Sequence, residues 1–276
     1  MTTLVTGGTG TIGRLIVRGL LERQVPVRIA SRRVPQEVPA GAEHVTVDLT
    51  GPLPAGLFDG VRQLFLFPAD GDLAPALKEA AGAGVEHVVV LSSLAAAGEK
   101  ERDLTSDSGL HHRAVEEAVA ASGLPTTTLR PGTFATNLLF WAHSIRFSGG
   151  VDGPYPTSAQ APVHEADIAD VAVAALTDGR HRGTVHRLTG PQALTQADQL
   201  AVIAAALGRP LTYRTITPEQ FTATMSQWMP PGIIAMMLRY WAETVDDPDA
   251  VTSTEAITGR TRSLTEWACD HVADFR

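Results

Sequence analysis

The chain has 276 residues, of which 44% are apolar, so it can bury a large core in one or two domains. A formal net charge of −8 argues against a surface that binds polyanions, so nucleic acid is not an expected partner. Cys269 is the only cysteine, which excludes an intrachain disulfide and suits a reducing compartment. No uncharged apolar run reaches membrane-spanning length, and the first predicted strand starts almost at Met1. We therefore expect a cytoplasmic protein that does not bind a membrane.

A buried strand, a glycine-rich turn and the start of a helix follow one another within residues 3–14. The glycines at 7, 10 and 13 have the spacing G-x-x-G-x-x-G. In a dinucleotide-binding turn the first glycine permits the tight turn, the second lets the backbone approach a pyrophosphate, and the third lets the helix lie close to the sheet. The helix also points its free N–H groups at that anion. We predict cofactor contacts from Gly7, Thr9, Gly10, Thr11, Ile12 and Gly13.

The end of the second predicted strand, residues 26–30, is where such a fold selects its cofactor. Folds that bind NAD usually place an acidic side chain here, which binds the ribose 2′-OH, whereas this sequence has Ser31, Arg32 and Arg33. Guanidinium groups bind phosphate oxygens in pairs and therefore suit a 2′-phosphate. The residues predict NADPH or NADP⁺ as the cofactor, with NAD the weaker alternative. A solvated basic turn is the other interpretation.

Strand and helix patterns alternate along the first 130 residues. Further strands are predicted at 44–47, 61–67, 85–91 and 125–130, helices at 73–82 and 109–122, and connections at 50–60 and 99–108. This alternation implies right-handed crossovers and a doubly wound, parallel α/β sheet that binds ligands at the carboxyl ends of its strands. Asp48 suits a contact with adenine and a loop cap equally. The cofactor contacts expected at these strand ends are Asp48, Leu49, Phe67, Pro68, Ser92, Pro131, Gly132 and Phe134.

Four segments resemble the NmrA-like, atypical branch of the short-chain dehydrogenase/reductase superfamily. They are TGGTGTIG at 6–13, the pattern S-G-L-P-x-T-x-L-R-P-G-x-F-x-x-N at 122–137, EADIADVA at 165–172 and LTGP at 188–191. The resemblance covers essentially the whole chain. It implies a Rossmann domain that binds NAD(P), a small and mainly helical C-terminal substrate domain, and a protein that is either a reductase or a redox-sensing regulator.

One departure from the superfamily concerns proton transfer. Superfamily members carry a Tyr-x-x-x-Lys pair on the helix after the serine strand, whereas this chain has Gly109 and Arg113 at those positions. Ser93 matches the superfamily serine that binds a substrate carbonyl. Without a phenol, catalysis falls to Ser93, Arg113, a neighbouring histidine or solvent. Our histidine candidate is His112, because an imidazole can donate a proton near neutral pH, although His111 and His112 also suit a solvated helix face. Arg113 is also expected to contact the cofactor.

The later residues predict the substrate side. A helix and loop at 138–163, a helix at 166–176 and a strand at 184–188 precede a tail in which Thr195, Thr217 and Ser263 are placed to cap helices. We assign 1–188 to the cofactor domain, with 134–163 partly on the substrate side, and 189–276 to a substrate-binding or lid domain. The aromatic and methionine-rich stretch 228–241 suits a bulky apolar substrate, and equally a core or a dimer face. The substrate-binding candidates are Ser93, Asn137, Trp141, Trp228 and Met237.

Two functions are compatible with these residues. The first is an NADPH-dependent reductase of a small hydrophobic carbonyl, quinone or enone, acting as a monomer or homodimer. The second is a regulator that senses NAD(P) without turnover. Ser93 and the aromatic stretch favour the enzyme, whereas the missing tyrosine favours the sensor. No cluster of histidine, aspartate and glutamate has metal-ligand spacing, so we expect no metal.

Overall fold

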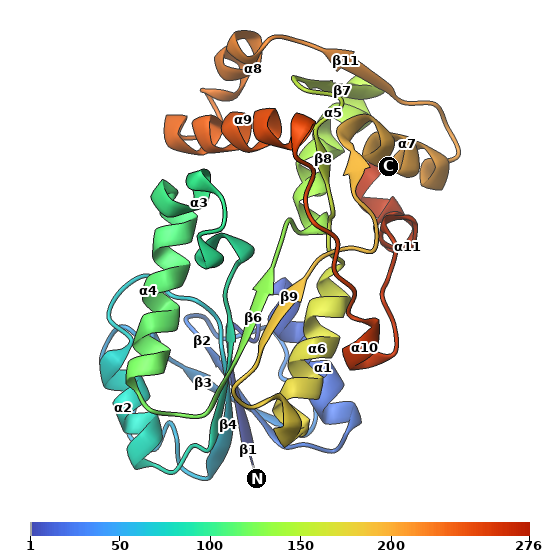
Figure 1. Ribbon diagram of the computed structural model, residues 1–276. Coiled ribbons are helices and arrows are strands. Elements are labelled where there is room, and N and C mark those ends of the chain that lie inside the picture. The colour runs from blue at the N-terminus through green and yellow to red at the C-terminus, as the bar shows by residue number, and fades with distance from the viewer. Residues whose placement is uncertain (1) are drawn as a thin grey trace. The chain divides into compact units, whose positions relative to one another are not determined.

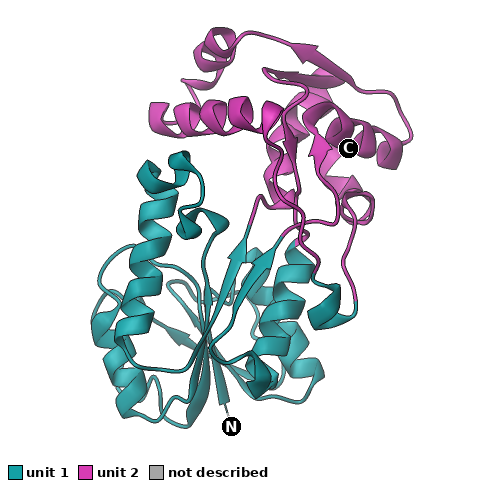
Figure 2. Ribbon diagram, viewed as in Figure 1, with its two compact units in different colours: residues 1–131, 165–188, 254–259 teal, residues 132–164, 189–253, 260–276 magenta. Residues whose placement is uncertain are grey.

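The computed structural model describes residues 2–276, which form two units (Figure 2). The first unit contains the chain up to Pro131 together with 165–188 and 254–259, and the second contains 132–164, 189–253 and 260–276. The units differ from the expected domains in two segments. Residues 132–164 belong wholly to the second unit, and 254–259 return to the first because the short helix formed there packs on the helix at 165–177.

The first unit is built on a seven-stranded sheet in the order β3-β2-β1-β4-β5-β6-β9 (Figure 1). Its strands are β1 (Thr2–Thr6), β2 (Val27–Ser31), β3 (Ala42–Thr46), β4 (Val61–Leu66), β5 (His87–Leu91), β6 (Thr126–Pro131) and β9 (Val185–Leu188). All six pairings between them are parallel. The strand order reverses between β1 and β4, so the carboxyl ends of these two strands mark the crevice where a doubly wound sheet binds its ligand. The predicted fold class is confirmed.

Helices cover both faces of this sheet. They are α1 (Thr11–Glu22), α2 (Ala74–Gly82), η1 (Leu94–Ala97), α3 (Glu101–Thr105), α4 (Asp107–Ala121), α6 (Glu165–Thr177), η3 (Gly179–His181) and α10 (Glu255–Thr258). Helices α1 and α6 pack together on one face, and α2 and α4 lie on the other (Figure 1). Strand β5 is buried at all five positions, as a parallel strand with both faces covered should be.

One predicted connection in this unit is wrong. Residues 99–108 contain α3 and the start of α4 rather than a charged loop. Ser106 caps α4, because its Oγ accepts a hydrogen bond from the Gly109 N–H at 3.0 Å. Helix α3 has only five residues, which is too short for an apolar periodicity to be visible.

The second unit has its own core. Its helical elements are η2 (Ala135–Trp141), α5 (Ala142–Ser148), α7 (Gln196–Leu207), α8 (Pro218–Met225), α9 (Pro231–Asp246), α11 (Leu264–Asp270) and η4 (Val272–Phe275). Buried Trp141, Ile145, Leu200, Trp267 and Phe275 belong to its hydrophobic core. Thr195, Thr217 and Ser263 each accept a hydrogen bond from the backbone N–H three residues ahead, which confirms the predicted caps.

Four short strands in this unit were not expected. Strand β7 (Gly150–Gly153) pairs with β11 (Thr212–Thr215), and β8 (Ala159–Gln160) pairs with β10 (Leu194–Thr195). They have two to four residues each, so no alternation of apolar and polar positions can identify them. Among residues 2–276, no helix combines the length and the apolar character that a membrane span requires.

A buried histidine on β5 makes the free energy of unfolding depend on pH. His87 is 1% exposed, and its ring nitrogens lie 2.9 Å from Thr127 Oγ1 and 3.1 Å from Gln63 Oε1. Burial lowers the pKa of His87 to about 4, and the charges of Arg182 and His181 act in the same direction. Because the unfolded chain titrates near 6.5, it binds more protons than the folded chain between pH 6.5 and 4. Stability therefore falls as the pH falls through this window.

We expect His87 alone to lower the free energy of unfolding by roughly 3 kcal/mol between pH 7 and pH 4. Urea titrations at several pH values measure this change. The control variant His87→Gln keeps a polar side chain that does not titrate, and it should make the dependence less steep, while the other histidines whose pKa is lowered still contribute. An equally steep dependence in that variant would assign the acid sensitivity to other groups.

Candidate cofactor and catalytic site

The glycine-rich turn joins β1 to α1 at the point where the strand order reverses. Gly7 has φ +62°, in the left-handed region, and a Cβ built on Gly13 would lie 2.1 Å from the Gly7 carbonyl oxygen. No side chain caps α1 at Gly10, and its first turn holds no acidic residue. The N–H groups of that turn therefore remain available for a pyrophosphate. The side chain of Ile12 is buried, so only its backbone can take part.

Phe67 lies against this turn. Its N–H donates to Thr6 Oγ1 at 2.7 Å, and the same hydroxyl donates to the Phe65 carbonyl at 3.1 Å. The Phe67 side chain begins 3.0 Å from the place that a Cβ on Gly7 would occupy. Thr6 thus ties the carboxyl ends of β1 and β4 together and leaves a partly exposed aromatic ring, followed by Pro68, beside the phosphate turn. Sequence reasoning missed Thr6, whose only signal is a hydroxyl at the end of the first strand.

The basic turn after β2 has its guanidinium groups exposed. Within residues 2–276, neither Arg32 nor Arg33 has a hydrogen bond or ion pair from its side chain. Ser31 differs, because its Oγ donates to the Arg33 carbonyl at 2.7 Å and lies 2.9 Å from His44 Nε2. Its one hydroxyl hydrogen is therefore already used inside the protein. The two arginines keep the donors that the prediction requires.

Asp48 closes the loop that follows β3. Its Oδ1 accepts hydrogen bonds from the Thr50 N–H at 3.0 Å and from Thr50 Oγ1 at 2.8 Å. These bonds lower the pKa of Asp48 below its ordinary value, and the charge of Arg32 contributes further. The loop-cap interpretation is thus confirmed, and a contact with adenine stays a prediction. Leu49 is buried in the core of the first unit, so only its backbone can face a ligand.

Ser92 belongs to a charged network rather than to an open surface. It is 2% exposed, and its Oγ donates to Glu116 Oε1 at 2.5 Å. Arg130 holds the same carboxylate through Nε at 2.9 Å and Nη2 at 2.6 Å. Burial raises the pKa of Glu116, but the hydrogen bonds from Arg130 and Ser92 outweigh it and leave this pKa lower than usual. The hydroxyl of Ser92 is therefore occupied, and a cofactor contact is possible only through its backbone.

Ser93, at the carboxyl end of β5, presents a hydroxyl that still has a hydrogen to donate. Its Oγ accepts a hydrogen bond from the Ala95 N–H at 3.2 Å and so caps η1. Among the described residues that hydroxyl has no acceptor of its own. The side chain is half-buried, which limits competition from water. This geometry suits a donor to an oxygen on which negative charge develops.

The position of the superfamily tyrosine is closed by backbone. A Cβ on Gly109 would lie 2.0 Å from the Asp103 carbonyl oxygen and 3.0 Å from Ser106 Oγ. Arg113, one turn later, donates from Nη2 to the carbonyls of Asp103 at 3.3 Å and Leu104 at 3.0 Å. Its buried Nη1 has no hydrogen-bond partner among residues 2–276. Arg113 therefore holds α3 against α4 and keeps Nη1 as a spare donor group, so its contact with cofactor or substrate stays a prediction.

We expect Gly109→Tyr to restore no tyrosine-dependent chemistry. Its Cβ must displace the carbonyl of α3, which should destabilise the protein by about 1–3 kcal/mol, the usual range for overpacking. The matched control is Ala114→Tyr, at an exposed position of the same helix. Thermal unfolding and single-turnover reduction measure both effects. A Gly109→Tyr protein that is as stable as the control variant and reacts faster than the wild type would contradict the interpretation that backbone fills the space of a side chain at 109.

The burial of His112 bears on its expected role as a proton donor. Burial lowers the pKa of His112 to about 4, and the charge of His111 adds to this effect, while Glu116 opposes it. His112 is thus neutral at pH 7 and is no imidazolium acid, although a neutral ring can still donate one hydrogen bond. Its Nδ1 is buried and has no hydrogen-bond partner in the described part of the chain. His111 lies with its Nδ1 3.4 Å from the exposed Asp70 carboxylate, as on a solvated helix face.

The substrate candidates of the second unit lie in different surroundings. Trp141 is 7% exposed and fills the core, whereas Asn137 is exposed. Trp228 is 77% exposed, just before α9, and Met237 is half-buried on that helix.

Tyr240 anchors α9 because its hydroxyl shares a hydrogen bond with Thr133 Oγ1 at 2.7 Å and donates another to Asp249. Pro131 ends β6, and Gly132 and Phe134 follow it half-buried at the start of the second unit.

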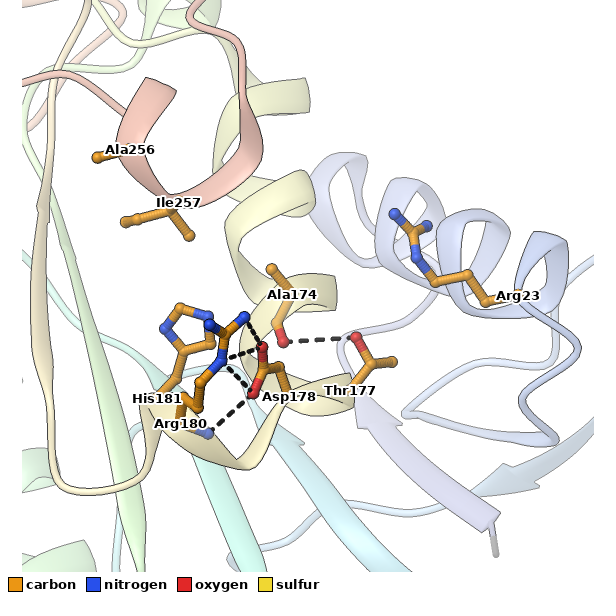
Figure 3. Close-up of a pocket in the computed structure, with 8 residues that line it drawn as sticks. All are labelled: Arg23, Ala174, Thr177, Asp178, Arg180, His181, Ala256 and Ile257. Carbon is orange, nitrogen blue, oxygen red and sulfur yellow. Dashed lines mark hydrogen bonds and ion pairs between the residues drawn. The ribbon is translucent and has the colours of Figure 1, made fainter.

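A pocket of about 360 Å³ is lined by residues from the end of α1, from α6 and the turn after it, and from α10 (Figure 3). Its lining residues are Arg23, Ala174, Thr177, Asp178, Arg180, His181, Ala256 and Ile257. Arg23 follows the last residue of α1, whereas the glycine-rich turn precedes the first, and twelve helical residues span about 18 Å. Arg180 is paired with the Asp178 carboxylate at 2.6 Å. The pocket is therefore separate from the cofactor site.

Residues 2–276 contain no group of three His, Cys, Asp or Glu side chains placed to hold a metal ion.

Comparison with known proteins agrees with this geometry. The sequence model of an NAD(P)H-binding family matches residues 7–179. A (4-alkanoyl-5-oxo-2,5-dihydrofuran-3-yl)methyl phosphate reductase from Streptomyces griseus is 35% identical over 282 residues, which cover 99% of this chain and 98% of the relative. An NAD(P)H azoreductase from Xenophilus azovorans is 35% identical over 286 residues, with the same two coverages.

A solved structure shows the same fold. The NADPH-dependent quinone oxidoreductase from Escherichia coli superposes with a TM-score of 0.76 at 24% identity, covering 97% of this chain and 98% of that one. The family match spans more than half of the chain, and the two relatives align along nearly all of it. Together with the glycine-rich turn, this establishes that the chain belongs to the NAD(P)H-binding family and confirms the resemblance to atypical short-chain dehydrogenases/reductases.

Proposed function

We propose that the protein is an NADPH-dependent reductase of a small, hydrophobic and conjugated carbonyl, quinone or enone. The observation that carries the proposal is the hydroxyl of Ser93, which keeps a hydrogen to donate at the carboxyl end of a strand in a dinucleotide-binding sheet. Such a donor has a direct use in reduction, because the substrate oxygen becomes negative as hydride arrives. Binding a dinucleotide without turnover does not need it.

The residues of the first unit fit NADPH. The open first turn of α1 suits the pyrophosphate, and Arg32 and Arg33 offer exposed guanidinium groups to a 2′-phosphate. The cofactor, when bound, supplies the hydride. Ser93 donates a hydrogen bond to the acceptor oxygen, and the spare Nη1 of Arg113 can add a positive charge. Neutral His112 can orient a ligand but leaves the final proton to solvent or to an acid within the substrate.

The names of the relatives support a conjugated substrate. They describe the reduction of an unsaturated furanone phosphate and of an azo compound, and the structural neighbour is named for quinones. Each of these is an unsaturated acceptor of hydride. The exposed apolar side chains of Trp228, Ile233 and Met236 are our proposed contacts for such a substrate, together with Met237 and Asn137. The second unit is accordingly our proposed substrate-binding domain.

Oxidation of NADPH, followed by absorbance with quinones, enones, cyclic ketones and azo dyes as acceptors, tests the proposal. We expect turnover with at least one conjugated acceptor and a slower rate with NADH. Ser93→Ala serves as the control for chemistry at this site. If the protein binds NADPH but no acceptor oxidises it even in a single turnover, it is not a reductase of this class.

The second candidate is a sensor of the NADPH/NADP⁺ ratio. The backbone packed against Gly109 favours the sensor function, because a protein with no space for a phenol there lacks the proton donor of its superfamily. A sensor requires that NADPH and NADP⁺ stabilise different conformations. Different protease sensitivity with the two cofactors, combined with no turnover, would select this function.

We expect Trp228→Ala to raise the KM for substrate roughly tenfold, which corresponds to about 1.4 kcal/mol of lost apolar contact, with NADPH affinity unchanged. Trp228 is 77% exposed, so its removal should not affect folding. The matched control is Phe147→Ala, which removes an equally exposed aromatic ring from α5. Steady-state kinetics and cofactor titration separate the two parameters. A loss of cofactor affinity in Trp228→Ala would remove this residue from the substrate contacts.

We also propose that the protein works in the cytoplasm as a monomer or homodimer. The single, exposed cysteine supports a reducing compartment, because disulfides form and persist in oxidising compartments and are rare in the cytosol. The acidic net charge supports small-molecule rather than nucleic-acid partners.

A further inference from the structure

The edge strand of the sheet carries a histidine that contacts the cofactor-selecting turn. His44 lies on β3, which is the edge strand in the sheet order of the described residues and pairs with β2, and its Nε2 is 2.9 Å from Ser31 Oγ. In the register of these strands, His44 is opposite Ile29 and Thr46 is opposite Ser31. The side chains of His44 and Ser31 therefore meet beside the point where β2 ends and the two arginines begin.

The direction of the hydrogen bonds follows from the number of hydrogens. Ser31 has one hydroxyl hydrogen, and its Oγ donates it to the Arg33 carbonyl at 2.7 Å. The hydroxyl must therefore accept from His44, which donates through Nε2–H. Both the neutral ring with its proton on Nε2 and the charged ring have this donor. The result is a chain of two hydrogen bonds from His44 through Ser31 to the backbone of Arg33.

This chain acts on the conformation of the basic turn. The bond from Ser31 Oγ to the carbonyl two residues ahead closes a local turn that includes Arg32 and Arg33. The guanidinium groups have no hydrogen bond or ion pair within residues 2–276 that would orient them. Their approach to a ligand therefore depends on the backbone from which they extend. A turn that is already ordered loses less conformational entropy when the phosphate binds.

We propose that His44 is a positioning residue for the 2′-phosphate of NADPH: it holds Ser31 in the rotamer that orders the Arg32-Arg33 turn. The inference rests on the proposed NADPH dependence and names a residue that selects the cofactor from outside the basic turn. His44 does not touch the phosphate. Its contribution concerns mainly NADPH, because NADH carries an uncharged 2′-hydroxyl where NADPH carries the phosphate.

Titration of NADPH and NADH into His44→Leu tests the proposal. The affinity for NADPH should fall about fivefold, which is the change usually caused by the loss of one hydrogen bond. The affinity for NADH should stay unchanged. His44→Gln, whose amide can donate from a similar place, should regain most of the loss. Unchanged NADH affinity also shows that the His44→Leu protein is folded. Equal losses for both cofactors, or no loss, would overturn the proposal.

A double-mutant cycle tests whether His44 acts through Ser31. If it does, Ser31→Ala and the double variant Ser31→Ala/His44→Leu should bind NADPH equally well, because the first change already breaks the chain. Additive losses would mean that His44 contacts the phosphate directly, and the positioning role would be wrong. A wild-type protein that binds both cofactors equally would instead refute the NADPH dependence, so the two failures are distinguishable.

Discussion

Ser93→Ala is expected to slow hydride transfer from saturating NADPH by about 10²–10³-fold, the usual effect of removing one well-placed oxyanion donor. The hydroxyl of Ser93 accepts a hydrogen bond from Ala95 and keeps its own hydrogen for a ligand. Alanine removes that donor, while η1 loses only one capping bond. Stopped-flow measurement of a single turnover separates this effect from product release.

The neighbouring serine provides the matched control. Ser92→Ala removes a hydroxyl of the same kind one residue earlier, but that hydroxyl is bonded to Glu116. The main effect of Ser92→Ala should be a lower free energy of unfolding, and its effect on the rate of hydride transfer should be small. Equal rate losses in the two variants would mean that the strand end, rather than the free hydroxyl of Ser93, matters for reduction.

Replacing both arginines of the basic turn should remove the preference for NADPH. Arg32→Ala/Arg33→Ala loses the charge-assisted bonds to the 2′-phosphate, so the affinity for NADPH should fall by a factor of about 10–150, which corresponds to roughly 1.5–3 kcal/mol. The affinity for NADH should hardly change. Titration of both cofactors, at low and high salt, measures the effect, and salt should weaken NADPH binding to the wild type more than to the variant.

A control for net charge accompanies this prediction. Arg18→Ala/Arg23→Ala removes two positive charges from the later part of α1 and the residue that follows it, away from both the glycine-rich turn and the basic turn. If this control loses NADPH affinity to the same extent, the effect is one of overall charge. If the basic-turn variant still prefers NADPH, the 2′-phosphate is bound elsewhere.

The parts of the fold that depend on neighbouring residues could be predicted from the sequence. The turn around Gly7 and Gly13, the cap at Thr195 and the break before α9 each rest on residues that lie within about six positions of one another in the sequence. Their physical causes are left-handed backbone, a side-chain acceptor for a free N–H, and a proline in the first helical turn.

The parts that depend on distant residues could not be predicted. Glu116 receives hydrogen bonds from Ser92, which follows β5, and from Arg130, which lies on β6. No spacing pattern in the sequence predicts that these residues come together. The partnership of His44 with Ser31 has the same origin, since it arises from strand pairing. The pKa of His112 follows from its burial, and burial of a single helix position is a property of the packed fold.

The space available to a side chain at Gly109 and the hydrogen bonds of Arg113 depend on the same backbone, that of α3. Because the Asp103 carbonyl occupies the space of a side chain at 109, a tyrosine there is acceptable only after α3 has been shortened or moved. Shortening α3 first, however, removes the carbonyls that Arg113 binds. Each change is therefore unfavourable when it is made alone. Engineering tyrosine-dependent chemistry into this chain must begin with the backbone at residues 99–106, and it must supply new partners for Arg113 before a tyrosine is placed at 109.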